Sequence, residues 1–314
     1  MVTIDLITGF LGSGKTTFIR SYAEKLIEQG TNLCILESDH GAINVDALIL
    51  QELEGPLCDV EMIVGGDGAE AHMRRFRTKL ISMGMLGYER VIVEPSGIYD
   101  VDEFFDTLRE EPLNRWYQIG NVFALVDGST EFDALSHEAA YMMASQIACS
   151  GKVLLTHMEE TEASVDTILE KLNGMLSSVR SDRILKKSDL ITPASAWNGD
   201  VWEEFVTSGH VLASYEKQEI SDGSGFQSLF YMHITDSEEE LEKKIQRLFK
   251  DDTCGHVRRV KGFLPAKEKW KEINATRDTF RIEEVSAGQN VLIVIGEKLQ
   301  KEQIGQYWPE AVTV

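Results

Sequence analysis

The chain has 314 residues, of which 43% are hydrophobic and 26% are charged, so it is long enough for one large or two moderate globular domains. Its formal net charge of −21 would repel a phosphate backbone, and no basic stripe interleaved with aromatic residues offsets that charge, which excludes nucleic acid as a partner. The four cysteines form no Cys-x-x-Cys pair, and the sequence shows neither a signal peptide nor a membrane-spanning apolar run, so a cytoplasmic protein with no membrane partner is expected.

Short apolar runs alternate with longer amphipathic runs through about the first 200 residues, a pattern typical of βαβ units around a parallel sheet. The predicted strands cover residues 2–8, 32–37, 61–64, 90–94, 121–127, 152–156 and 189–192. The predicted helices cover residues 15–29, 69–85, 101–108, 132–149 and 162–176. Residues 1–215 are therefore predicted to form an α/β domain with a mostly parallel sheet.

The stretch "GFLGSGKTT" (Gly9 to Thr17) follows the first predicted strand, opens the first predicted helix and fits the P-loop pattern G-x-x-x-x-G-K-[ST] in full. Glycines let the backbone wrap closely round phosphate oxygens, the lysine places a cation on the β and γ phosphates, and the next hydroxyl binds Mg²⁺. The alternative is a glycine-rich turn without a ligand. The pattern predicts a nucleotide site made by Gly12, Ser13, Gly14, Lys15, Thr16 and Thr17, with Lys15 also catalytic and Thr16 a magnesium ligand.

Carboxylates follow three of the predicted strands, and the carboxyl ends of parallel strands are where a bound nucleotide can be reached. Glu94 in "RVIVEPSG" is predicted to be catalytic, by reaching the magnesium shell or orienting the attacking water, and a loop or cap carboxylate is the alternative. Asp39 and Asp46 in "ESDHGAINVD" are candidate magnesium ligands in a metal-responsive switch, although a turn of Asp, Asn and Gly fits nearly as well. Asp127 in "LVDGS" is interpreted mainly as structural.

The pattern changes near Tyr215, where "SYEKQEISDGSGF" is polar and ends in a Gly/Ser cluster, so a linker is predicted over residues 216–225. Residues 226–314 are predicted to be mainly strands, at 226–234, 254–263, 271–274, 279–284 and 291–295. One helix opens at Ser237, with Glu240 three residues on as a capping box. A smaller α+β C-terminal domain is therefore expected.

In this order, the motifs resemble those of the CobW-like family of P-loop GTPases, which are relatives of the urease and hydrogenase nickel-insertion GTPases. The matching stretches are "ITGFLGSGKTT", "VEPSG", "ALVDGS" and "QIACSGKVLLTHMEE", and the C-terminal part is similar through "HVRRVKGFLP", "KEIN" and "VLIVIGEKL". The resemblance implies hydrolysis of GTP, with Mg²⁺, coupled to delivering a metal or assembling a metallocofactor, cobalamin-related ones included. It also implies a client metalloprotein or corrinoid enzyme as partner. Slow turnover is expected because no arginine finger is evident.

The chain departs from the family's usual Cys-x-Cys-Cys after the third strand, where it has "VGGDGAEAH", so thiolates cannot hold a transition metal at this position. The nearest cysteine, Cys58, is interpreted as a small buried hydrophobe. Asp67, Glu70 and His72 form a candidate site with oxygen and nitrogen ligands, and a solvated helix start is the alternative. The stretch "HMRRFRTK" that follows could face a partner or a phosphate, and a charged helix face is the alternative.

The family's Asn-Lys-x-Asp motif, which selects guanine, is replaced here by Thr156, His157, Met158 and Glu159. The Asp of that motif accepts hydrogen bonds from both N1–H and the N2 amine of guanine, and Glu159 keeps this carboxylate on a longer side chain. His157 can stack on the base, while Thr156 keeps only a hydroxyl in place of the bracing amide. Guanine binding with weakened selectivity is predicted, with relaxed base specificity as the alternative.

Two other functional classes stay open. A nucleotide-binding scaffold without hydrolysis would explain the altered base motif and the missing cysteines, whereas the intact Lys15, Thr16 and Glu94 favour hydrolysis. A P-loop kinase acting on a small molecule would carry a basic lid, and no Arg-rich loop is found beyond residues 74–77 and 258–261. The sequence does not specify the client, the metal or whether the chain forms a homo-oligomer.

Overall fold

The computed structural model describes residues 1–10, 12–39, 50–64, 69–95, 101–218, 226–267, 269–277, 279–285 and 288–313. The chain divides into two compact units, Met1–Glu219 and Ile220–Val314. The predicted domain bounds, 1–215 and 226–314 around a linker, stay a prediction. Within the described residues, no helix is both long and apolar enough to cross a membrane.

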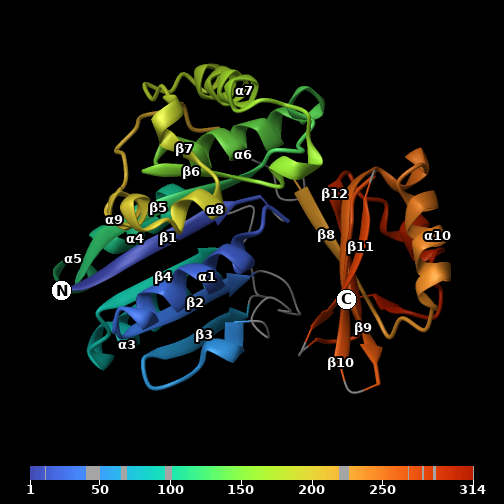
Figure 1. Cartoon of the computed structure of the whole chain (residues 1–314), viewed down its shortest axis with the longest axis horizontal. Coiled ribbons are helices and arrows are strands. Elements are labelled where there is room, and N and C mark those ends of the chain that lie inside the picture. Colours follow the sequence, from blue (N-terminus) through green and yellow to red (C-terminus); the bar gives the residue numbers. More distant parts are fainter. Residues whose placement is uncertain are drawn as a thin grey trace. The chain divides into compact units, whose positions relative to one another are not determined.

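The first unit is built on a seven-stranded sheet in the order β3-β2-β4-β1-β5-β6-β7, in which all neighbouring strands are parallel (Figure 1). Its strands are apolar because helices cover both faces of a parallel sheet. The strands are β1 (Val2–Gly9), β2 (Leu33–Asp39), β3 (Cys58–Val64), β4 (Arg90–Pro95), β5 (Tyr117–Asp127), β6 (Lys152–Thr156) and β7 (Leu190–Ile191). The helices are α1 (Lys15–Glu28), α3 (Ala69–Leu86), α4 (Val101–Arg109), α5 (Leu113–Trp116), α6 (His137–Ala148), α7 (Val165–Ser178), α8 (Pro193–Ala196) and α9 (Gly199–Val206).

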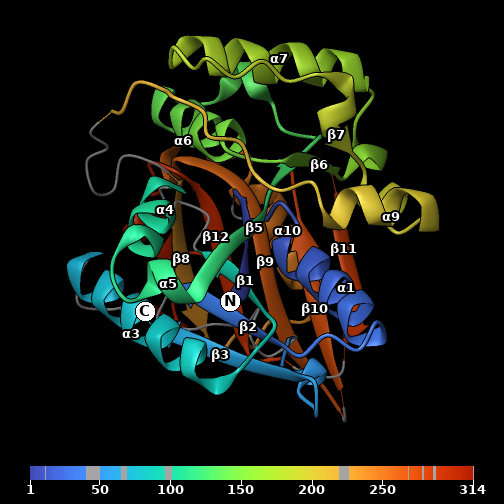
Figure 2. The same cartoon turned by 90° about the vertical axis from the view of Figure 1, so that its left-hand side faces the viewer.

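Helices cover this sheet from two sides, with α1 and α9 on one side and α3, α4 and α6 on the other (Figure 2). The core under α1 and α9 is aromatic: the rings of Phe123 on β5 and Phe205 on α9 stack with their centroids 4.4 Å apart. Phe18 and Tyr22 of α1 pack into the same cluster. This packing fixes the start of α1 against the carboxyl end of β1, where the predicted phosphate site lies.

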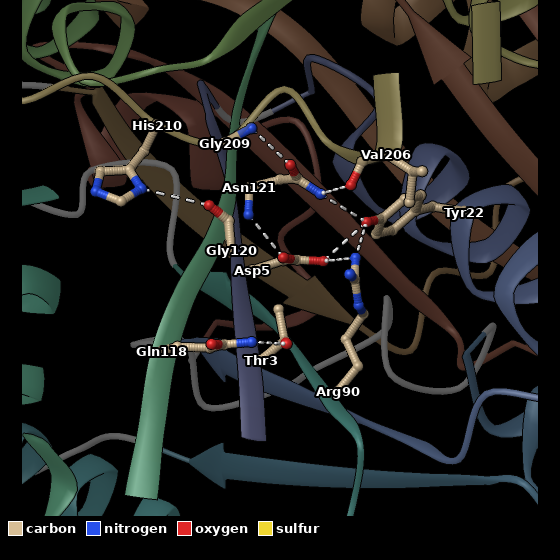
Figure 3. A network of polar contacts seen from close by, with 10 residues as sticks. All are labelled: Thr3, Asp5, Tyr22, Arg90, Gln118, Gly120, Asn121, Val206, Gly209 and His210. Atoms are coloured by element: carbon tan, nitrogen blue, oxygen red, sulfur yellow. Dashed lines mark hydrogen bonds and ion pairs between the residues drawn. The ribbon is translucent and has the colours of Figure 1, made fainter. Parts of the chain in front are cut away.

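A buried polar network ties β1, α1, β4 and β5 together (Figure 3). One residue of β1, Asp5, lies opposite two residues of β5, Gly120 and Asn121, so β5 carries a β-bulge. The Asp5 carboxylate accepts hydrogen bonds from the Tyr22 hydroxyl, from Arg90 Nη1 and from the Asn121 amide, each at 2.8 Å. Burial nevertheless raises the pKa of Asp5, because desolvation outweighs the attraction of Arg90 and these hydrogen bonds. The network gives the Asn121 amide of the bulge a hydrogen-bond acceptor.

The second unit is a six-stranded antiparallel sheet in the order β11-β10-β9-β12-β8-β13. Its own core joins this sheet to α10 through Tyr231, Leu241, Ile245, Val260 and Leu292, among others. The strands are β8 (Phe226–Met232), β9 (His256–Ala266), β10 (Lys269–Ala275), β11 (Phe280–Val285), β12 (Val291–Glu297) and β13 (Val312–Thr313), and the helices are α10 (Glu238–Leu248) and α11 (Lys301–Gly305).

The predicted fold class is confirmed: a parallel α/β unit precedes a smaller unit of antiparallel strands with helices. The predicted capping box of α10 is also confirmed, since the Ser237 amide donates to Glu240 Oε2 at 3.1 Å. Two predicted helix starts are wrong. The helix predicted from residue 132 begins at His137, because Ser136 Oγ accepts the N–H of Ala139 at 3.1 Å. The helix predicted from residue 162 begins at Val165, where Ser164 caps it in the same way.

Candidate functional site

The turn between β1 and α1 has a backbone conformation that favours glycine. Gly9, Gly12 and Gly14 have φ angles of 144°, 83° and 85°. A Cβ on Gly9 would lie 2.5 Å from the carbonyl oxygen of Leu125, so a larger residue would push the turn away from β5. Gly14 is the N-cap of α1, which places the first free N–H groups and the positive end of the helix dipole at the turn. Such a turn suits a phosphate group.

Lys15, Thr16 and Glu94 form a buried polar cluster at the start of α1. Lys15 Nζ donates to the carbonyl oxygens of Gly9 and Phe10 at 3.0 and 3.2 Å. Thr16 Oγ1 lies 3.3 and 3.4 Å from the two carboxylate oxygens of Glu94, which comes from β4. No side chain of the three is more than 7% exposed. The fold therefore brings together the cation, hydroxyl and carboxylate that the sequence predicted for one site.

Two hydroxyls near this cluster are buried without a hydrogen-bond partner among the described residues, Thr8 Oγ1 at the end of β1 and Ser13 Oγ in the turn. A buried polar atom left without a partner costs about 1–3 kcal/mol. Phosphate oxygens would supply the missing acceptors. The donors and the glycine backbone of this turn thus fit a nucleoside triphosphate, with Lys15 and Thr16 placed for its phosphates and a magnesium ion.

Glu37 at the carboxyl end of β2 was not predicted as a site residue. It pairs in register with Glu94 on the neighbouring parallel strand, and it is only 3% exposed. Two buried carboxylates side by side repel each other unless a cation or a proton lies between them, and oxygen ligands of this kind suit a divalent ion. The signal in the sequence was a glutamate that ends an apolar strand, in "CILESD".

The end of β6 and the loop that follows it (residues 156–160) lie against the glycine-rich turn. Thr156 Cγ2 and His157 Cε1 are 3.8 and 4.0 Å from the position that a Cβ on Gly14 would take. Thr156 Oγ1 lies 3.3 Å from the Val126 carbonyl oxygen, so this hydroxyl braces the loop on β5. His157 takes a left-handed backbone with φ of 51°. The structure therefore brings two of the three predicted base-recognition residues to the predicted phosphate site.

Asp127 holds His157 in place, a role that the sequence did not predict. Its Oδ2 lies 3.0 Å from His157 Nδ1, and its Oδ1 accepts hydrogen bonds from the Ser129 amide at 2.9 Å and hydroxyl at 2.6 Å. Burial by itself would raise the pKa of Asp127, but the contact with His157 and the two bonds from Ser129 lower it below its usual value of 3.8. Asp127 is therefore ionised at neutral pH. The hint in the sequence was its place at the end of a predicted strand, in "LVDGS".

The other predicted residues are less tightly placed. Glu159 lies in the 3-10 helix Met158–Glu160 with an exposed side chain, and Thr17 is also exposed. Asp39 ends β2, and Asp46 lies outside the described residues. The roles of Asp39, Asp46 and Glu159 stay predictions.

The predicted metal site after β3 also stays a prediction, because Asp67 lies outside the described residues. His72 on α3 is 4% exposed, and its Nε2 lies 2.9 Å from Ser38 Oγ. The described residues contain no group of three or more His, Cys, Asp or Glu side chains arranged to hold a metal ion. Cys58 is buried as predicted, and burial raises the pKa of its thiol to about 12, so it is not a thiolate at neutral pH.

Comparison with known proteins places this geometry in a family. Residues 3–186, more than half of the chain, match the model of the CobW/HypB/UreG nucleotide-binding domain. The zinc chaperone YjiA of Escherichia coli (strain K12) is 22% identical over 187 residues, which cover 57% of this chain and 55% of YjiA, so the match spans about half the length of this curated relative.

Solved structures are similar at lower identity. Zn(II)-bound YjiA GTPase from E. coli aligns over 98% of both chains, with 19% identity and a TM-score of 0.42. HypB from Helicobacter pylori in complex with nickel aligns over 65% of this chain and 83% of its own, with 16% identity and a TM-score of 0.40. The family match over residues 3–186 confirms the resemblance drawn from the motifs, and the chain belongs to the CobW/HypB/UreG family of nucleotide-binding domains.

Proposed function

We propose that this protein binds and hydrolyses GTP with Mg²⁺, and that its nucleotide state controls the delivery of a metal or metallocofactor to a client protein in the cytoplasm. The observation that carries the proposal is the buried cluster of Lys15, Thr16 and Glu94 beneath a glycine-rich turn. Family membership supports it, and one relative, YjiA, is described both as a zinc chaperone and as a GTPase.

Each residue of the cluster has a defined task in hydrolysis. Lys15 places a positive charge where negative charge develops on the phosphates, and the glycine turn offers backbone N–H groups to the same oxygens. Thr16 and Glu94, with Glu37 beside them, are the residues that would hold magnesium, which neutralises phosphate charge when bound. Glu94 also orients the attacking water. Slow turnover is expected, because the sequence shows no evident arginine finger.

Base selection falls to the loop after β6. His157, held by Asp127 next to Gly14, offers a flat ring to the base, and Glu159 offers the carboxylate that accepts from N1–H and N2 of guanine. Glu159 has one methylene more than the family's Asp, so selectivity for guanine over adenine is expected to be weaker than in relatives that carry the Asp.

The cargo is proposed to be held by harder ligands than thiolates. The Cys-x-Cys-Cys stretch is absent, and the four cysteines are buried without a disulfide. Relatives described as a zinc chaperone and as a nickel complex support a transition metal as cargo. The client is proposed to be a metalloprotein or a corrinoid enzyme.

Hydrolysis is tested by comparing GTP turnover of the wild type with Glu94→Gln. The amide keeps the shape of the side chain but lacks the negative charge that would help to hold magnesium and to orient the attacking water, so a fall in kcat of about 10²-fold or more is expected. Glu111→Gln, at a side chain that is 68% exposed, is the matched control and should keep the wild-type rate. Equal rates in wild type and Glu94→Gln would instead favour a scaffold that binds nucleotide without hydrolysing it.

A further inference from the structure

Residues 209–218 form an extended segment between α9 and the second unit, and we call this segment the strap. From Val211 to Glu216 its side chains alternate between half-buried and exposed, as they do along a strand. The strap ends at Gln218, and the boundary between the two units follows Glu219. The way in which the strap is held therefore determines where the chain leaves the first unit.

Backbone amides along the strap donate hydrogen bonds to the first unit. The donors are the amides of Gly209, Val211, Ser214, Glu216 and Gln218, at 2.8, 3.0, 2.9, 2.8 and 3.2 Å. Their acceptors, in the same order, are Asn121 Oδ1, the Cys149 carbonyl, Asp182 Oδ1, the Val179 carbonyl and the Tyr141 hydroxyl. Because these bonds recur every two or three residues, the strap follows the surface of the first unit along its length.

The start of the strap is joined to the buried network of Asp5 (Figure 3). Asn121, which accepts from the Gly209 amide, also donates through Nδ2 to the Val206 carbonyl at 2.8 Å and to the Tyr22 hydroxyl at 3.1 Å. Tyr22 belongs to α1 and is fully buried. The start of the strap is thus fixed to the core of the first unit.

Helix α4 contacts the strap near both of its ends. Asp102 Oδ2 lies 2.9 Å from Lys217 Nζ, and the ring centroids of Phe105 and His210 are 5.7 Å apart. Positions 102 and 105 are three residues apart, so both contacts lie on one side of the helix. The same helix is anchored in the core by Phe104, which is fully buried. A shift of α4 would therefore move Asp102 relative to the strap.

Helix α4 follows β4, the strand that carries Glu94 of the proposed nucleotide site. Thr16 Oγ1 lies 3.3 and 3.4 Å from the two carboxylate oxygens of Glu94. Magnesium demands a nearly octahedral set of oxygen ligands, so its binding by Thr16 and Glu94 would change this contact. The end of β4 and the helix that follows it are the part of the fold placed to respond to such a change.

We propose that α4 passes the nucleotide state of the site to the strap, and that the contact between Asp102 and Lys217 breaks when nucleotide and magnesium bind. This rests on the nucleotide binding proposed above and adds the segment through which it would act on the exit of the chain from the first unit. The two side chains are 24% and 62% exposed, and an ion pair at such a site is weak, so a small movement of α4 is enough to break it. The start of the strap stays bonded to Asn121.

The test is hydrogen exchange of the full chain, without nucleotide and with a saturating non-hydrolysable GTP analogue and Mg²⁺. The amides of Glu216 and Gln218 are expected to exchange at least about threefold faster with the analogue, because the end of the strap is released. The amides of Gly209 and Val211 should stay within about 1.5-fold. Calorimetry on the same samples establishes that the analogue is bound.

Three variants assign the response to the ion pair. Lys217→Glu should speed exchange at the end of the strap without nucleotide and leave less than about a 1.5-fold further effect of the analogue. Lys217→Arg keeps the cation and should keep the response. Arg180→Glu is the matched control: it changes the net charge as Lys217→Glu does and removes the 3.1 Å pair of Arg180 with Glu216, which does not involve α4, so the response should persist.

The results that would overturn the proposal concern the end of the strap. Exchange of Glu216 and Gln218 that is unchanged or slower with the analogue bound would refute it, and so would a response that persists in Lys217→Glu or is lost equally in Arg180→Glu. A bound analogue with an unchanged strap would refute this proposal alone. An analogue that does not bind would refute both this proposal and the nucleotide binding on which it rests.

Discussion

Glu159 is the residue whose length sets base recognition in this account. Shortening it in Glu159→Asp restores the reach of the family's carboxylate, so GTP binding is expected to tighten by about 1 kcal/mol, roughly fivefold in Kd. Calorimetric titration with GTP and ATP measures the change, and Glu160→Asp on the next residue is the control. An unchanged affinity for GTP, or an equal gain for ATP, would show that Glu159 does not contact guanine.

Asp127 gives the same loop a dependence on pH. The pKa of its carboxyl is lower in the folded protein than in the unfolded chain, so its contribution to stability is complete above the unfolded value and is lost as the pH falls through the folded value. Urea unfolding of wild type and Asp127→Asn should therefore differ most above about pH 5 and converge towards pH 3. A difference that is constant over this range would mean that Asp127 is not held as an ion by His157 and Ser129.

The site residues differ in whether the sequence next to them is enough to predict their role. The P-loop could be predicted from the sequence because its glycines, lysine and hydroxyl are adjacent and each meets a local backbone need. Glu37 could not, since its place beside Glu94 depends on the register of two strands far apart in the chain. The contact of Asp127 with His157 likewise needs β5 and β6 to be neighbours.

At the scale of elements, the carboxylate of Asp5 stabilises the β-bulge of β5. Asp5→Ala leaves Arg90 without its buried partner and the Asn121 amide without an acceptor, so a loss of about 3–5 kcal/mol in the free energy of unfolding of the first unit is expected. Urea denaturation, with hydrogen exchange of β1 and α1 amides to report on this unit, measures it. Asp133→Ala, at a side chain that is 82% exposed, should cost less than about 0.5 kcal/mol. Equal losses in the two variants would contradict the role given to Asp5.

Elements could be predicted where local pattern and packing agree. The strands β1, β4 and β6 are apolar runs that are largely buried, and their bounds fall within one residue of the predicted ones. The strands β3 and β5 begin at Cys58 and Tyr117, three and four residues before their predicted starts. Two predicted helix starts are wrong because Ser136 and Ser164 cap the helices inside a longer amphipathic run. The short helices α5, α8 and α9 were missed because a run of four to eight residues gives too little periodicity to detect.

At the scale of the whole molecule, all residues of the proposed nucleotide site lie in the first unit, which has a core of its own. The chain's net charge of −21 opposes the binding of a triphosphate. We therefore expect nucleotide binding to need a divalent cation near Thr16 and Glu94, in addition to the charge of Lys15 and the dipole of α1. Nucleotide affinity should fall steeply when magnesium is removed.

The most direct test of guanine-nucleotide binding is a calorimetric titration of the full chain with a non-hydrolysable GTP analogue and the matching ATP analogue, each with Mg²⁺ and with EDTA. We expect the GTP analogue to bind about tenfold more tightly than the ATP analogue with Mg²⁺, and both to weaken strongly in EDTA. Lys15→Ala should abolish the heat of binding. Equal affinity for the two analogues, or binding of neither, would contradict the account.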